Sequence, residues 1–321
     1  MVPRVEKGAV YATDELSPAA AIPADGRYIH PQNLLDGGSC GDEGCHPDIT
    51  AQWEQSAHHF ASFNNPFYRR SVEGLLVDND VAKARWCASC HDPLLLMAGD
   101  LDTEDPAFMD QHEHAMAGIT CLACHGIKEV DGPTGNGNYV LSHPDYAAQA
   151  TTPVGTFAGL RRTLIETKPG PHASAMLSQG VLNDQFCTSC HKVSVPPAVN
   201  DYRWKRGQDQ YDAWYESAFS GKHPRAFYRR DQQNCISCHM PATPSTDQGN
   251  DDGFVKSHRF AAANTALPYL NGHPEQLAQV QESLQQEVAA VDIFWLSVDG
   301  KTYGPGEALP PLSAGQNVEL E

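Results

Sequence analysis

Apolar residues recur at helical spacing shortly after residue 46. The members of this stripe are Ile49, Trp53, Ala57 and Phe60. Proline suits the first turn of a helix, so Pro47 marks a start, and Asn64-Asn65-Pro66 is a suitable end. The pattern predicts an amphipathic helix over 47–60 that carries His58 and His59. A shorter helical stretch is expected around 81–86.

The pattern changes towards the end of the chain. Pro274-Glu275 is a favourable helix start, and apolar residues follow at helical spacing. These residues are Leu277, Val280, Leu284, Val288 and Val291. Residues 293–298 are then typical of a strand, Asp299-Gly300 is a hairpin turn signal, and residues 301–303 form a candidate return strand. Residues 318–321 alternate apolar and acidic side chains like the start of another strand, so we expect a helix plus a partial, sandwich-like β segment over 273–321.

Five short cysteine motifs occupy the middle of the chain. In chain order, motif 1 is Cys40-x-x-x-x-Cys45-His46, motif 2 is Cys87-x-x-Cys90-His91, motif 3 is Cys121-x-x-Cys124-His125, motif 4 is Cys187-x-x-Cys190-His191 and motif 5 is Cys235-x-x-Cys238-His239. C-x-x-C-H is the attachment signature of a c-type haem. Its two thiols form thioethers to one porphyrin, and the adjacent histidine coordinates the iron. Motif 1 is a stretched copy. The sequence thus predicts five covalently bound haems c, with these five histidines as proximal ligands.

The competing interpretation of a C-x-x-C pair is half a zinc site or a thioredoxin-like redox pair. One motif alone would leave that open. All 10 cysteines fall inside the five motifs, so none remains for a disulfide. Five copies, each followed by histidine, favour haem over zinc.

Five haems in a chain of this size determine the expected fold. The chain contains 26 Gly and 23 Pro, which predicts long irregular loops. Its hydrophobic content is a modest 40%, as expected where porphyrin surface replaces aliphatic core. We expect a mainly α protein with extensive irregular loops, a haem-dominated core and a short β segment at the C-terminus. The expected organisation is an extended N-terminal arm over 1–39, a pentahaem domain over 40–272 and the C-terminal segment over 273–321.

The other histidines are candidates for the distal position on each iron. Of 15 histidines, five follow the motifs and ten remain, twice what five distal positions require. We expect His58, His172 and His258 first: a helix precedes His58, Pro169 and Pro171 flank His172, and Lys256 and Arg259 would place His258 near haem propionates. His114 and His143 come next. The reserves are His30, His59, His112, His223 and His273, and a surface position is the alternative for any one of them.

The formal net charge of −18 argues against nucleic acid as a partner, because phosphate binding needs a basic surface. No stretch approaches the roughly 18–20 apolar residues of a membrane span. Covalent haem is attached outside the cytoplasm, yet residues 1–22 contain no continuous apolar region. We therefore expect a signal peptide to have been removed, a periplasmic or extracellular location, and redox proteins or extracellular acceptors as partners.

Two segments resemble a known family. Cys45-His46-Pro47-Asp48-Ile49, followed by Gln52-Trp53 and Ser56-Ala57-His58, is one; Gly118-Ile119-Thr120-Cys121 with Cys124-His125-Gly126 is the other. They resemble the cytochrome c-554-related multihaem family, over roughly residues 40–260. The resemblance implies a mostly helical, loop-rich fold with haems in close pairs, and electron transfer outside the cytoplasm. It also implies that His58, in the Ser-x-His segment, is a distal iron ligand.

Three functions remain open at this point. The first is electron transfer along a chain of bis-histidine haems, where two imidazoles saturate each iron so that no substrate binds. The second is a haem enzyme acting on a small nitrogen or sulfur oxyanion, which needs an iron with an open position. The third is a subunit that self-assembles into an extracellular cytochrome polymer. No sequence feature identifies an open iron, so electron transfer is favoured and no enzymatic activity is expected.

Overall fold

The computed structural model describes residues 40–77, 81–101, 114–142, 158–178, 185–195, 205–222, 231–286, 294–304 and 306–320, with short stretches at 19, 21–24, 29, 34–35, 112, 181 and 199. Among the candidate ligands, His30, His143 and His223 lie outside the described residues. Val288 and Val291, at the end of the expected C-terminal helix, also lie outside them.

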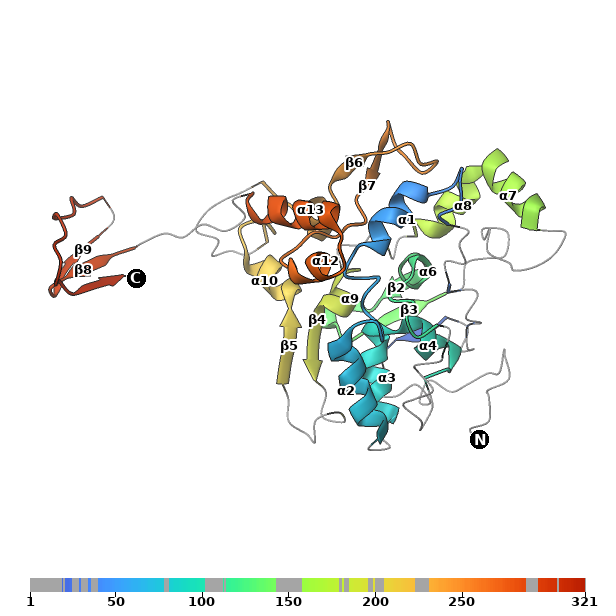
Figure 1. Ribbon diagram of the computed structural model, residues 1–321, viewed down its shortest axis with the longest axis horizontal. Coiled ribbons are helices and arrows are strands. Elements are labelled where there is room, and N and C mark those ends of the chain that lie inside the picture. Colours follow the sequence, from blue (N-terminus) through green and yellow to red (C-terminus); the bar gives the residue numbers. More distant parts are fainter. Residues whose placement is uncertain are drawn as a thin grey trace.

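Short helices connected by irregular segments form most of the body of the molecule (Figure 1). In chain order they are α1 (Pro47–Glu54), α2 (Pro66–Val77), α3 (Val81–His91), α4 (Pro93–Ala98), α6 (Cys121–His125), α7 (Ala158–Thr167), α8 (Pro169–Met176), α9 (Thr188–His191), α10 (Gln210–Glu216), α11 (Cys235–His239), α12 (Ala266–Leu270) and α13 (Pro274–Leu284). The expected helical stretch at 81–86 is present, and it continues through motif 2 as α3.

Strands also occur along much of the chain, so the expectation of β structure at the C-terminus alone is wrong. A three-stranded sheet has the order β1-β3-β2, from Ile22–Pro23, Tyr139–Leu141 and Ile127–Val130. Two-stranded antiparallel sheets join β4 (Lys192–Val195) to β5 (Lys205–Asp209) and β6 (Ala242–Pro244) to β7 (Phe254–Lys256). The fold of the described chain is therefore a mixture of helices and small sheets. Hydrophobic period did not indicate these strands because each is only two to five residues long.

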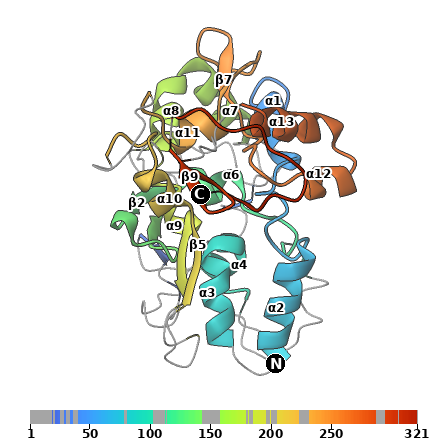
Figure 2. The same cartoon turned by 90° about the vertical axis from the view of Figure 1, so that its left-hand side faces the viewer.

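The main apolar core lies between α2, α3, α4 and the sheet β1-β3-β2. Helix α2 contributes a stripe of Tyr68, Val72 and Leu76, spaced four residues apart on one face. Helices α2 and α3 lie side by side in both views (Figures 1 and 2). The segment expected as an extended arm also contributes to this core, since Ala21, Ile29 and Leu34 are buried in it.

The second half of the body has a much thinner apolar core. Among the described residues from 158 to 286, the buried apolar side chains are Val255, Ala261, Pro268 and Val280. Motifs 4 and 5 lie in this half. Porphyrin rings bound there would supply apolar surface that the side chains do not.

Helix α1 starts where the sequence indicated but ends earlier. Pro47 occupies the first turn, and His46 is the N-cap residue. The helix ends at Glu54, six residues before Phe60, so the expected extent to 60 is wrong. His58 and His59 lie in the turns that follow, where the backbone can approach other parts of the chain.

The C-terminal elements follow the expected pattern closely. Helix α13 begins at Pro274, although it ends at Leu284 with Gln285 as C-cap. Strands β8 (Leu296–Val298) and β9 (Lys301–Tyr303) form an antiparallel hairpin, and β10 (Val318–Leu320) pairs with the other edge of β8. Asp299 and Gly300 both have positive φ, of 49° and 83°, as a two-residue type I′ turn requires. Figure 1 shows this small sheet at one end of the molecule, away from the helices.

Candidate haem sites

The cysteine motifs share one local geometry. In motif 4, the backbone N–H of His191 donates to the carbonyl of Cys187 at 2.9 Å, closing one helical turn. Motifs 3 and 5 are the helices α6 and α11, and motif 2 is the last turn of α3. This turn puts both thiols and the imidazole on one side of the backbone, as attachment to a single porphyrin requires.

The stretched motif 1 closes in the same way despite its two additional residues. The N–H of His46 donates to the carbonyl of Cys40 at 2.8 Å, and a turn between Asp42 and Cys45 absorbs the longer spacer. Gly44 has φ of 81°, which glycine adopts without steric cost. The first cysteine and the histidine are therefore brought together in motif 1 as they are in motif 4.

Three motif histidines bond through Nδ1 to a backbone carbonyl. Nδ1 of His91, His125 and His239 lies 2.8 Å from a backbone carbonyl, that of Ala61, Met176 and Ala261 respectively. A carbonyl oxygen can only accept, so Nδ1 carries the proton and Nε2 keeps its lone pair. Metal-ligating histidines typically show this arrangement, because it fixes both the tautomer and the ring orientation.

Three histidine pairs bring a motif histidine close to a predicted distal one. The ring centroids are 6.3 Å apart for His46 and His172, 6.2 Å for His125 and His258, and 6.0 Å for His191 and His58. The paired residues are far apart in sequence and lie on separate elements. The three residues expected first as distal ligands are the three found in these pairs.

These distances suit two imidazoles on opposite sides of one metal ion. An imidazole nitrogen binds a metal at about 2.0 Å and lies about 1.1 Å from its own ring centroid, so the two centroids would be about 6.2 Å apart. Ordinary aromatic pairs span about 4.5–7 Å, so one such distance would carry little weight. Three values close to 6.2 Å, each involving a different motif, are harder to attribute to packing alone.

Burial favours the neutral form of several of these imidazoles. It lowers the pKa of His58 to about 3 and of His258 to about 4, because the charged form loses its hydration. Burial is also the main cause of the lowered pKa of His46, His91, His125 and His191. Neutral imidazole is the form that binds metal.

Thiols of different motifs lie next to one another. The neighbouring Cys190 thiol raises the pKa of the Cys90 thiol, and the Cys235 thiol raises the pKa of the Cys187 thiol, so each pair lies close together. None of the ten cysteines, all of which the structure describes, forms a disulfide. Motif 4 thus lies between motifs 2 and 5.

The loop between β2 and β3 holds motifs 2 and 4 together. Tyr139 Oη donates to the carbonyl of Ser89 at 2.6 Å, and Gly137 N–H donates to the carbonyl of Ser189 at 2.6 Å. Ser89 and Ser189 occupy equivalent positions in the two motifs. Sequence reasoning did not identify this clamp, because it depends on contacts between distant residues.

The other candidate histidines have different surroundings. His114 is buried, and its ring lies 5.4 Å from that of His112. The ring of His59 lies 4.6 Å from that of Trp53 and is tilted relative to it, and its Nδ1 bonds to the carbonyl of Glu54. His273 is the N-cap residue of α13 and lies 6.0 Å from Phe60.

A loop near the end of the body supports motif 1. Both carboxylate oxygens of the buried Asp247 accept hydrogen bonds from the first turn of α1, from the N–H groups of Asp48 and Ile49 at 3.0 Å each. A side chain at Gly249 would come within 2.8 Å of the His46 ring. This loop therefore fixes the helix that follows His46 and packs against the imidazole itself. The hydrophobic periodicity of the sequence did not indicate that this loop would support motif 1.

Residues 39–126 match the family described as cytochrome c554 and c-prime. This part of the chain is a cytochrome c554 and c-prime domain. The match covers motifs 1 to 3, so it confirms the resemblance there but ends well before residue 260. No curated protein and no solved structure matches the chain.

The cytochrome domain gives the motifs their chemical meaning. A c-type cytochrome carries haem c and exchanges electrons with redox partners, and such proteins are typically exported. In the described part of the chain, no helix has the length and apolar character needed to cross a membrane. Motifs 4 and 5 lie outside the matched residues, but they share the local geometry of motifs 1 to 3, which lie within the match.

Proposed function

We propose that this protein is an electron-transfer cytochrome carrying five covalent haems c, one on each motif. The matched family supports haem attachment at motifs 1 to 3. Motifs 4 and 5 have the same C-x-x-C-H sequence and the same helical turn. Few apolar side chains are buried around them, and bound porphyrin would supply the apolar packing surface there.

The axial ligands follow from the ring pairs. His46 with His172, His125 with His258, and His191 with His58 would each hold one iron between them. His91 and His239 are the proximal ligands of motifs 2 and 5, and His114 and His143 remain candidates for their distal positions. When bound, haem c supplies a one-electron ferric–ferrous couple.

The single observation that carries this function is the spacing of about 6 Å in the three imidazole pairs. An iron held by two imidazoles has no position left for a substrate, so these sites can change oxidation state but cannot bind a reactant. The thiol contacts from motif 4 to motifs 2 and 5 bring the attachment edges of neighbouring porphyrins together. This arrangement suits transfer between adjacent sites.

The test combines three measurements on the protein purified with its haems. Intact mass should exceed the polypeptide mass by five haem units. Electron paramagnetic resonance (EPR) of the oxidised protein should show low-spin iron at the paired sites. The redox titration should be broad, because each charge shifts the potential of its neighbours.

Two results would contradict the proposal. Superimposed, independent one-electron waves would argue against neighbouring haems in contact. Fast turnover of nitrite or hydroxylamine, together with high-spin iron, would favour the haem enzyme instead.

A further inference from the structure

Residues 257–262 contact three of the candidate haem sites. The ring of His258 pairs with that of His125, and the carbonyl of Ala261 accepts from Nδ1 of His239. Between them, the ring of Phe260 lies 4.3 Å from that of His58 and 5.6 Å from that of His258. Phe260 therefore touches imidazoles that belong to two different irons, those of motifs 4 and 3.

The backbone holds Phe260 in an unfavourable conformation. Its φ is 48°, in the left-handed region that bulky residues rarely adopt because it is sterically unfavourable. Such a conformation persists only where the surroundings impose it. Neighbouring residues must therefore hold this segment in place.

Four polar contacts anchor the residues next to Phe260. The carbonyl of Arg259 accepts from Gln276 Nε2 at 2.8 Å, and its guanidinium bonds to Glu275 at 2.8 Å and to Gln55 at 3.1 Å. The N–H of His258 donates to Gln52 Oε1 at 2.9 Å. Helices α1 and α13 thus hold the segment on either side.

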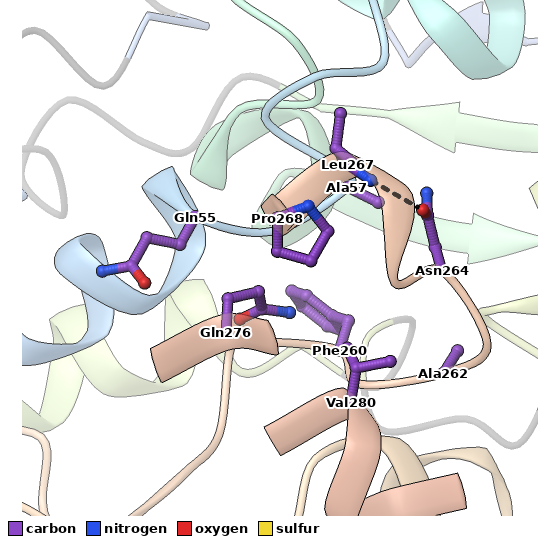
Figure 3. Close-up of a pocket in the computed structure, with 9 residues that line it drawn as sticks. All are labelled: Gln55, Ala57, Phe260, Ala262, Asn264, Leu267, Pro268, Gln276 and Val280. Atoms are coloured by element: carbon purple, nitrogen blue, oxygen red, sulfur yellow. Dashed lines mark hydrogen bonds between the residues drawn. The ribbon is translucent and has the colours of Figure 1, made fainter. Parts of the chain in front are cut away.

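The ring of Phe260 forms part of the wall of a small pocket next to these anchors. Gln276, Val280, Pro268 and Ala57 line the same pocket, among others (Figure 3). The Phe260 ring meets both imidazoles edge to face, at interplanar angles of 74° to His58 and 75° to His258. Edge-to-face contact is a favourable aromatic geometry and leaves a ring little freedom to rotate.

The three imidazole pairs differ in the angle between their planes. His46 and His172 are near parallel at 15°, and His125 and His258 at 24°, whereas His58 and His191 are crossed at 77°. The angle between two axial imidazole planes sets the splitting of the iron d orbitals. Parallel planes give a rhombic low-spin EPR spectrum, and crossed planes give a strongly anisotropic one.

We propose that Phe260 is a positioning residue that holds the His58 imidazole crossed to that of His191, making the motif 4 iron electronically distinct from those of motifs 1 and 3. This inference rests on the proposed bis-histidine ligation. Phe260 contacts no iron itself and acts through His58. Because motif 4 lies between motifs 2 and 5, the orientation of this one ring sets the properties of the central site.

The experiment is EPR of the oxidised holoprotein with substitutions at Phe260. The unaltered protein should show one strongly anisotropic low-spin signal beside rhombic ones. Phe260→Ala should shift the anisotropic signal towards the rhombic form, or convert that iron to high spin if His58 leaves it. Phe260→Tyr keeps the ring and should retain the signal. Phe254→Ala is the control, since Phe254 is a partly exposed phenylalanine of β7.

Phe260→Gly separates the ring from the backbone. Glycine removes the positive-φ strain as well as the ring, so a positioning role predicts the same spectral change in Phe260→Gly as in Phe260→Ala. A change in Phe260→Ala that Phe260→Gly does not share would assign the effect to strain and overturn the inference. If the Phe260→Ala protein does not accumulate with haem, the anisotropic EPR signal of Phe260→Leu tests the same role of the ring.

The outcomes separate this inference from the function it rests on. An anisotropic signal that is unchanged in Phe260→Ala or Phe260→Leu overturns the role of Phe260 and leaves bis-histidine ligation intact. Absence of low-spin iron in the unaltered protein overturns the ligation itself.

Discussion

The carbonyl oxygen of His58 lies where a side chain at Gly118 would have to go. A Cβ at position 118 would approach it to 2.7 Å and the carbonyl of His59 to 2.2 Å. Gly118 also has φ of 69°, and the N–H of the next residue, Ile119, donates to the backbone carbonyl of His58 at 2.9 Å. The segment that leads into motif 3 thus fixes the backbone of the residue proposed as distal ligand at motif 4.

We predict that Gly118→Ala displaces the turn carrying His58. The positive φ alone should cost on the order of 1–3 kcal/mol of unfolding free energy, and the clash adds to it. Part of the protein should show a high-spin iron in EPR. The matched control is Gly74→Ala, since a Cβ there meets nothing within 4 Å. Within helix α2, that change should stabilise by roughly 0.5–1 kcal/mol. Equal behaviour of the two variants would contradict the role given to Gly118.

His58→Ala should convert one iron from low to high spin, because it removes the imidazole paired with His191. The adjacent His59→Ala provides the control: its ring lies against Trp53 and its Nδ1 is bonded to Glu54. Optical and EPR spectra of the two variants make the comparison. A low-spin spectrum that survives His58→Ala would remove His58 from the set of ligands.

Motif 1 should carry a haem in spite of its long spacer, since His46 bonds back to Cys40 as His191 does to Cys187. The double substitution Cys40→Ala and Cys45→Ala should lower the intact mass by one haem unit, and acid-acetone should extract no haem from the unaltered protein. An unaltered protein whose mass corresponds to four haems would rule out attachment at Cys40 and Cys45.

Removal of residues 292–321 should leave every haem in place, because the sheet they carry contributes no residue to the described sites. Haem content and EPR spectra should match those of the full chain. Sedimentation of both forms then tests self-assembly: β9 and β10 are edge strands, and Val318 and Leu320 are exposed. A smaller assembly after deletion would make the sheet a subunit contact, and equal sedimentation would remove this support for a polymer.

Local sequence signals predicted local structure well. The Asp299-Gly300 hairpin, the Pro274 helix start and the helical stretch at 81–86 each depend on neighbouring residues, and all are present. The predicted end of α1 was wrong because Ala57 and Phe60, the last two apolar residues of the stripe, lie in turns and not in a helix. The strands β1 to β7 were missed because each is too short for a two-residue period to show, and β1 in addition pairs with β3, which lies far along the chain.

The candidate site divides in the same way. The motifs identify the cysteines and proximal histidines, and a count of remaining histidines gives the distal candidates. Which imidazole faces which motif depends on long-range packing, so His58 opposite His191 could not be read from spacing. Phe260, Gly249 and Asp247 carry no sequence signal, since each acts only through a distant neighbour.

The three imidazole pairs also bear on the order in which this protein folds. Each joins residues far apart in the chain, so closing it costs loop entropy that local contacts do not repay. His258, near the end of the body, completes the site of His125 only after most of the chain is present. A newly exported chain would therefore carry attached haems with one free axial position until its later segments arrive. Under the proposed ligation, axial ligation would be a late folding event, in which the metal closes loops that the thin apolar core around motifs 4 and 5 does not close alone.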